Sequence, residues 1–439
     1  IAISGDAKVN AQGGDQSGAG IGGGKEGAGS GIAISGGEVK ATGGDFGAGI
    51  GGGENGDGSG ITISGDAKVN ATGGKRSAGI GGGDEGSGRD IEITGGKVTA
   101  SSKSDGAGIG GGNSGDGENI TISGGEVTAT GGSDEEGLSS GYGAGIGGGY
   151  KGDGKRIKIT DGTVDAASDK GAGIGGGDDG NGENIAISGG KVTAKSSKNG
   201  AGIGAGEDKR MAGLIIIQDN AQITAIAGDR SAAIGSEGKR DMRGTILILG
   251  NARITTGMLL NDKVAFNYKT KEIEYTLDKN AIGRIGDGQD SNHKSLEGHY
   301  VLGPDVTING LNGSDIEKLK DYINMRLSGE NHDGDPENLT ALDIRSENGK
   351  FTVTAEGKGT VEKILYGGSE TVPAAPGTYP VTCVLRLGDE TIEFQIGTIV
   401  VPEGKSDDAD TPQSPLYRVT DKDGRDIAYT AEQKGGVLT

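Results

Sequence analysis

Short runs in which apolar and polar residues alternate recur along the first part of the chain and predict β-strands. In the unit of residues 32–60, three such runs are IAIS, EVKA and GAGI, separated by glycine-rich segments. Side chains alternate between the two faces of a strand, so Ile32 and Ile34 point to one side, and the Val-Ala and Ala-Ile pairs of the next two runs do the same. Three strands with two inward residues each predict one three-sided coil.

The run AGIGGG, or a close variant of it, returns at intervals of about 29 residues. Its isoleucines are Ile21, Ile50, Ile80, Ile109, Ile146, Ile174, Ile203 and Ile234. Such a period with strand-type patterning is typical of a solenoid, in which each unit buries its apolar side chains against its neighbours. We therefore predict a three-sided parallel β-helix of about nine coils over residues 1–257, with final coils that are richer in Leu and Ile and close the core near Gly257.

Beyond Gly257 the pattern predicts smaller, separate modules. For residues 258–337 we expect a mixed connector, with a hairpin in VAFNYKTKEIEYTLDKN and one amphipathic helix that begins at the capping-box sequence SDIE. Short strands at regular turns over residues 338–403 predict an immunoglobulin-like β-sandwich. We interpret residues 404–415 as an acidic linker and residues 416–439 as the truncated start of a further β module. The expected fold class is all-β.

Composition supports order through repetition and excludes several classes of function. Only 31% of residues are apolar and 3% are aromatic, whereas 96 residues are glycine. This apolar content is too low for one ordinary hydrophobic core. The net charge of −20 disfavours duplex nucleic acid and anionic membranes as partners, and no apolar run is long enough to insert into a membrane. The single cysteine, Cys383, permits no disulfide framework, and its apolar neighbours predict a buried core thiol.

The AGIGGG repeats resemble those of secreted and wall-anchored β-helical proteins of Gram-positive bacteria, often described as adhesins or carbohydrate-binding proteins. The segment VPAAPGTYPVTCVLRLGDETIEF resembles bacterial immunoglobulin-like modules that follow such regions. Together the two resemblances cover most of the chain. They imply an architecture and an extracellular location, because the shared residues are core and turn positions, and they transfer no catalytic motif.

Many parallel β-helices act on polysaccharides, and such chemistry requires titratable groups that converge in a cleft. The repeats are regular and nearly free of aromatic residues, and Asp161 and Asp165, near an insertion in the coils, are the carboxylates that stand out. We interpret both as ordinary turn and strand residues and predict no catalytic site. The three histidines, His293, His299 and His332, share no metal-ligand spacing and are expected at the surface.

Calcium is the cofactor alternative that the turns suggest. Asp57, Asp116 and Asp153 occupy equivalent positions in GGGENGDGSG, GGGNSGDGENI and GGGYKGDGKRI, where carboxylate oxygens of stacked turns could hold the ion. Aspartate is common in turns for structural reasons, and lysine and arginine crowd one of these turns, so we expect no metal or other cofactor.

The resulting prediction is a non-catalytic, extracellular cell-surface protein that serves as adhesin, stalk or matrix component and is attached through regions outside this sequence. The alternatives are a polysaccharide-binding module and, second, a polysaccharide lyase or hydrolase. Outward positions of the second strand, such as Thr99, Thr128 and Thr193, form the polar face that could lie along a polysaccharide or host glycan. Self-association through coil ends is a further expectation, whereas binding to nucleic acid or insertion into a membrane is not expected.

Overall fold

The structure is a computed structural model of the 439-residue chain. It describes residues 1–14, 16–132, 141–207, 214–228, 231–236, 244–258, 264–267, 272–275, 285–286, 298–302, 306–308, 311–312, 325–326, 339–347, 350–357, 359–387, 390–401, 433–434 and 437–438. The chain divides into two units. The first comprises Ile1–Leu302 and Val306–Leu327, and the second comprises Gly303–Asp305 and Ser328–Thr439.

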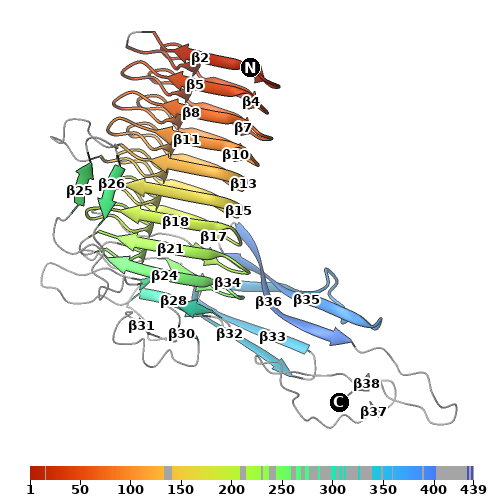
Figure 1. Ribbon diagram of the computed structural model, residues 1–439. Helices are drawn as coiled ribbons and strands as arrows, with labels where there is room; N and C mark the ends of the chain where they lie inside the picture. The colour runs from red at the N-terminus through yellow and green to blue at the C-terminus, as the bar shows by residue number, and fades with distance from the viewer. Residues whose placement is uncertain are drawn as a thin grey trace, which may run out of the picture. The chain divides into compact units, whose positions relative to one another are not determined.

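The first unit is a stack of coils, each built from three parallel strands that lie in three columns (Figure 1). The first-strand column consists of β1 (Ala2–Ile3), β4 (Gly29–Ile34), β7 (Gly58–Ile63), β10 (Gly88–Ile93), the start of β13 (Gly117–Thr130), the start of β15 (Gly154–Ser168), β17 (Gly182–Ile187), β20 (Leu214–Ile217), β23 (Thr245–Ile248), β28 (Gly298–Leu302) and β31 (Met325–Arg326). The second-strand column consists of β2 (Lys8–Gln12), β5 (Glu38–Thr42), β8 (Lys68–Thr72), β11 (Lys97–Ser101), the ends of β13 and β15, β18 (Lys191–Ser196), β21 (Gln222–Ala227), β24 (Arg253–Met258) and β29 (Thr307–Ile308).

The third-strand column is a separate sheet of nine two-residue strands. These are β3 (Ile21–Gly22), β6 (Ile50–Gly51), β9 (Ile80–Gly81), β12 (Ile109–Gly110), β14 (Ile146–Gly147), β16 (Ile174–Gly175), β19 (Ile203–Gly204), β22 (Ile234–Gly235) and β27 (Ile285–Gly286). Each strand pairs in register with its equivalent in the next coil, as Ile80 does with Ile109. The predicted three-sided parallel β-helix is therefore confirmed.

The interior of the stack is formed by the aliphatic residues that the alternation pattern placed inward. Ile91 and Ile93 of β10 are fully buried and lie in register with Ile61 and Ile63 of β7. The inward residues of the second strands, mostly Val and Ala, and the isoleucines of the third strands complete the interior, and these side chains belong to one continuous hydrophobic cluster with those of the first strands. Because like side chains lie above like at the spacing of paired strands, a small number of apolar residues suffices for each coil.

Glycine is required where the third strands of adjacent coils pass each other. Gly81 has a φ of +131°, and a Cβ at this position would lie 2.0 Å from the carbonyl oxygen of Gly110 in the next coil. The close passage allows the backbone hydrogen bond from Ile80 N to Gly108 O, at 3.0 Å, that joins the two coils. Each GIG run thus leaves no room for a side chain on the backbone that faces the next coil.

The β-helix continues past Gly257, so the predicted end is one coil too early. Ile285 pairs with Ile234, Tyr300 with Ile246 and Ile308 with Ile254, which adds a strand to each of the three columns. The predicted hairpin is confirmed as β25 (Val264–Asn267) and β26 (Glu272–Tyr275), which pair antiparallel. It lies, in sequence, between two strands of the β-helix, in a segment that the sequence pattern assigned to a separate connector.

The predicted amphipathic helix falls mostly outside the described residues. Its two described residues, Met325 and Arg326, form β31, which pairs in parallel with β28, so the helix does not extend to this point. A short strand, β30 (Leu311–Asn312), pairs antiparallel with β29. No helix among the described residues is long and apolar enough to cross a membrane.

The described part of the second unit is also all-β. It contains the antiparallel pair of β32 (Leu339–Glu347) and β33 (Lys350–Gly357), the three-stranded antiparallel sheet of β34 (Gly359–Tyr366), β35 (Gly377–Leu387) and β36 (Glu390–Val401), and the short pair of β37 (Gln433–Lys434) and β38 (Val437–Leu438). Tyr366, Val381 and Ile399 form its small core, against which Phe351 of β33 packs. The predicted linker over residues 404–415 lies outside the described residues, as does most of the expected further module over residues 416–439.

Replacement of Gly81 by alanine should destabilise the stack by about 3 kcal/mol or more, since the new methyl group collides with a backbone oxygen and the positive φ is strained for any L side chain. Gly24→Ala is the matched control, because a Cβ at exposed Gly24 meets nothing within 4 Å. It should change stability by about 0.5 kcal/mol or less. Urea unfolding followed by circular dichroism measures both. Equal midpoints for the two variants would contradict the close-passage account.

Candidate functional site

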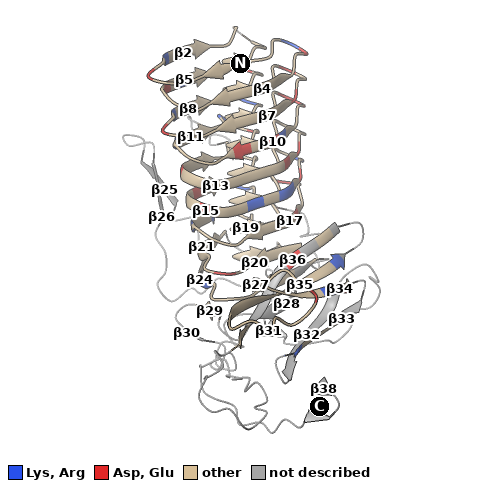
Figure 2. Cartoon of the chain, turned by 90° about the vertical axis from the view of Figure 1, so that its right-hand side faces the viewer, with Lys and Arg blue, Asp and Glu red and all other residues tan. Residues whose placement is uncertain are grey.

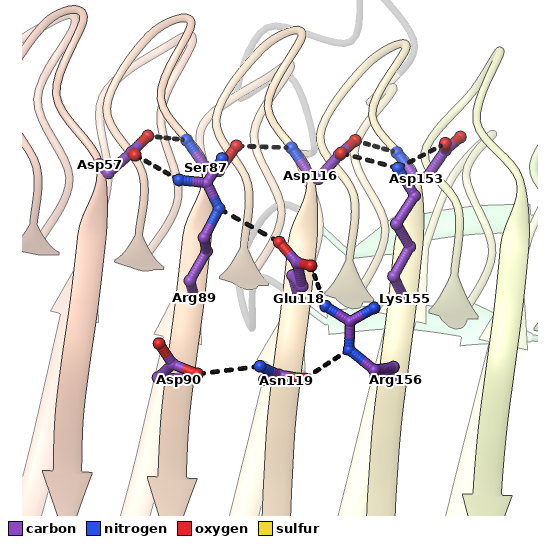
Figure 3. A network of polar contacts seen from close by, with 10 residues as sticks. All are labelled: Asp57, Ser87, Arg89, Asp90, Asp116, Glu118, Asn119, Asp153, Lys155 and Arg156. Atoms are coloured by element: carbon purple, nitrogen blue, oxygen red, sulfur yellow. Dashed lines mark hydrogen bonds and ion pairs between the residues drawn. The ribbon is translucent and has the colours of Figure 1, made fainter. Parts of the chain in front are cut away.

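The turns that precede β7, β10, β13, β15 and β17 carry a ladder of side-chain hydrogen bonds along the stack (Figure 3). Oδ1 of Asp57 accepts a hydrogen bond from the backbone N–H of Ser87 at 2.8 Å, and Oγ of Ser87 accepts one from the N–H of Asp116 at 3.3 Å. Asp116 bonds to Asp153 in the same way at 2.9 Å, and Asp153 to Asn181 at 2.8 Å. We name these five residues the turn ladder. The side chains of the first four residues each satisfy a backbone donor of the following coil, and Asn181 supplies the last of these donors.

Basic side chains from the adjoining first strands neutralise the carboxylates of the turn ladder. Arg89 Nη1 lies 2.5 Å from Asp57 Oδ2, and its Nε lies 3.2 Å from Glu118 on the next coil. Lys155 Nζ lies 2.8 Å from Asp116 Oδ2 and 3.0 Å from Asp153 Oδ2. Although partial burial by itself lowers the pKa of Lys155, hydrogen bonds and opposite charge from the two aspartates raise it above its ordinary value. The turn ladder is thus both hydrogen-bonded and charge-compensated.

The three calcium candidates all belong to the turn ladder, as their equivalent positions predicted. Each uses one carboxylate oxygen for a backbone N–H of the next coil and the other for an arginine or a lysine. The ammonium group of Lys155 lies between Asp116 and Asp153, where a bridging cation would bind. Among the described residues no group of three or more metal-ligating side chains is brought together. The geometry accounts for these aspartates as a link between coils.

A second row of polar side chains comes from the residues that directly follow Arg89, Glu118 and Lys155 in the first strands. The backbone at these positions is left-handed. Asp90, Asn119 and Arg156 have φ values of 53°, 54° and 52°. Asn119 Nδ2 donates to Asp90 Oδ1 at 3.0 Å, and Arg156 Nε donates to Asn119 Oδ1 at 2.7 Å. Since earlier coils have glycine at this position, the side-chain bonds offset the cost of placing larger residues there.

Two tyrosines are in contact, one in the segment before β14 and the other in the turn before β15. The rings of Tyr142 and Tyr150 are 4.9 Å apart between centroids. Lys170 Nζ lies 5.0 Å from the centre of the Tyr142 ring and also pairs with Glu207 at 3.3 Å, while Lys151 lies 4.9 Å from the Tyr150 ring. Cations therefore already occupy a face of each ring, as in a cation–π pair. The sequence drew attention to the tyrosines as rare aromatics but gave no sign that they touch.

The carboxylates singled out for catalysis do not face each other. Asp161 Oδ1 accepts a hydrogen bond from the N–H of its own neighbour Gly162 at 2.7 Å, which is a turn interaction. Asp165 lies on the outward side of β15 and pairs with Lys195 at 3.3 Å. Of the histidines, His299 lies in β28, paired with Thr245, and the other two fall outside the described residues.

The second-strand column lies beside the first-strand column (Figure 2), and the alternate, outward positions of its strands carry mostly polar residues. Its middle row runs in register through Asn10, Lys40, Asn70, Thr99, Thr128, Asp165, Thr193, Thr224 and Thr255. The predicted interrupted row of threonines is therefore present as a real surface. Lys68 and Lys97 lie side by side in the adjoining row, because they pair directly between β8 and β11. We name the outward side chains of this column the second-strand face.

Cys383 lies in β35 and is fully buried, as predicted for a core thiol. Burial raises the pKa of its thiol to about 11. Because the thiolate is the reactive form, the folded protein should react with iodoacetamide at neutral pH far more slowly than the urea-unfolded protein does. Mass spectrometry of the alkylated peptide measures the two rates. Equal rates would show that the thiol is accessible and would contradict the core assignment.

Lys155→Met should destabilise the stack by about 1–3 kcal/mol, because it leaves the carboxylates of Asp116 and Asp153 uncompensated. Lys158→Met is the control, since Lys158 is exposed on the same strand and its replacement should change stability little. In the unchanged protein, millimolar Ca²⁺ should not shift the melting temperature relative to a chelator. A clear rise with Ca²⁺ would show that the turn ladder binds the ion despite its internal pairing.

The comparisons with known proteins agree with the observed coils. A family model described as a beta helix repeat matches residues 1–25, 32–54, 61–84, 91–113, 120–150, 157–178 and 185–207. Each match covers one coil, and the seven matched coils follow one another in the stack. No match to the chain is found among curated proteins or among solved structures. Residues 1–207 thus carry beta helix repeats, in agreement with the parallel β-helix that the first unit forms.

Proposed function

We propose that this chain is a non-catalytic, extracellular protein of the cell surface whose β-helix serves as a stalk or adhesive scaffold. The observation that carries the proposal is the use of charged side chains in the turns. In the described coils they bond from one coil to the next, as Asp57, Asp116 and Asp153 do, instead of converging on a cleft. Such an arrangement favours mechanical continuity along the stack over chemistry at one point.

The β-helix repeat fold is consistent with surface and carbohydrate-binding proteins, and a location outside the cell suits the composition. Exposed polar side chains and a net charge of −20 favour solubility without a large apolar core. Polysaccharide binding is the second candidate function, favoured by the second-strand face, which offers hydroxyl, amide and ammonium groups in register. These groups are the kinds that hydrogen-bond sugars.

Antibodies raised against the protein test its location on intact cells of the source organism. We expect labelling without permeabilisation, and loss of the label after brief treatment of the cells with an external protease. A cytoplasmic protein of the same organism is the control for leakage. Labelling that appears only after permeabilisation would overturn the proposal.

Incubation with a panel of polysaccharides tests the non-catalytic assignment. We expect no release of oligosaccharides above the level of a buffer control, because Asp161 and Asp165 are engaged in separate interactions. Release that disappears in an Asp161→Asn or Asp165→Asn variant would instead support the alternative of a polysaccharide lyase or hydrolase. Chromatography of the soluble products is the measurement.

A further inference from the structure

The second-strand face is basic, although the chain as a whole is strongly acidic. Its basic side chains are Lys8, Lys40, Lys68, Lys97, Lys191, Lys195 and Arg253, and its acidic ones are Glu38, Glu126 and Asp165. Seven positive and three negative charges give the face a net charge of +4, against −20 for the whole chain. The remainder of the chain is therefore even more acidic than the total suggests, and this face differs from it in having a net positive charge.

Most of these basic groups are exposed and are not neutralised within the stack. Lys97 pairs with Glu126 at 2.6 Å and Lys195 pairs with Asp165 at 3.3 Å. Lys40, Lys68 and Lys191 are exposed and form no ion pair with any residue that the structure describes, and the same holds for Lys8 and Arg253. This contrasts with the turn ladder, where the basic side chains of Arg89 and Lys155 pair with carboxylates. The free charge thus remains available to a ligand.

The geometry of the face suits a long polymer. Parallel strands repeat at about 4.8 Å, so a chain that lies along the stack meets an equivalent row of side chains at every coil. Lys68 and Lys97 are in register on adjacent coils, and Lys40 lies on the coil next to Lys68. Asn70 is in register with Lys40 and with Thr99, so an amide and a hydroxyl that can hydrogen-bond sugar hydroxyls lie in the row next to Lys68 and Lys97.

We propose that the second-strand face binds an acidic polysaccharide whose sugars carry carboxylates, with the unpaired Lys40 and Lys68 as central contacts and Lys97, whose exposed ion pair with Glu126 is weak, beside them. A polyuronate offers one carboxylate and several hydroxyls in each sugar, which matches the mixture of ammonium, amide and hydroxyl groups on the face. Duplex nucleic acid matches less well, because its dense charge would be repelled by the rest of this acidic chain. The inference specifies the ligand class of the second candidate function and rests on an extracellular location.

Binding of the full chain to polygalacturonate, measured by biolayer interferometry, tests the proposal. The triple variant Lys40→Glu, Lys68→Glu, Lys97→Glu should weaken binding about tenfold or more, because it reverses the charge at the centre of the face. The control Lys25→Glu, Lys75→Glu, Lys158→Glu changes the total charge equally at exposed lysines elsewhere on the stack, and it should bind like the unchanged protein. Circular dichroism verifies that both variants keep their strands.

Three further results decide the question. Binding that weakens as salt is added, and is absent for the neutral polymer dextran, supports recognition of carboxylates. Absence of polygalacturonate binding, or equal loss in the two triple variants, overturns the proposal. Equal or tighter binding to duplex DNA also overturns it, since the face would then be a general polyanion surface. The labelling of intact cells is independent of these results, so a surface protein without this binding site would be recognised as such.

Discussion

The close passage of one coil over the next is the constraint on which the first unit depends. Paired backbones at the spacing of a parallel sheet leave no space for a side chain at Gly81, whose Cβ would lie 2.0 Å from a carbonyl oxygen of the next coil. The same passage places Ile80 directly over Ile109 and buries both. High glycine content and a low apolar fraction are thus two consequences of one geometry.

The polar residues complement this arrangement at the turns. Backbone donors in the turns need partners, and the turn ladder supplies them by having each aspartate, such as Asp116, accept a bond from the coil that follows. Carboxylates stacked in this way would repel one another, so Arg89 and Lys155 lie between them. Both oxygens of each of these aspartates have partners within the stack, one a backbone N–H and the other a basic side chain.

The side chains available for interaction with a ligand are those that form no contacts between coils. Side chains of the turns bond within the stack, and the third strands carry glycine where an outward side chain would stand. Outward side chains remain on the first and second strands, and those of the second strands form three rows that include free lysines such as Lys40 and Lys68. A repeat architecture therefore confines recognition to a flat, periodic face, which suits a polymeric ligand better than a small molecule.

The sequence by itself determined the architecture of the coils, because strand alternation and the AGIGGG period depend only on neighbouring residues and on one repeated geometry. It placed Ile32, Val39 and Ile50 inside correctly, but it ended the β-helix at Gly257, because the hairpin β25–β26 interrupts the period while strand pairing resumes at Ile285. Only the tertiary structure decided that Lys155 bridges Asp116 and Asp153 and that Lys68 and Lys97 share one face. Such contacts join residues from different coils. Which charged side chains lie close together therefore depends on the register between coils.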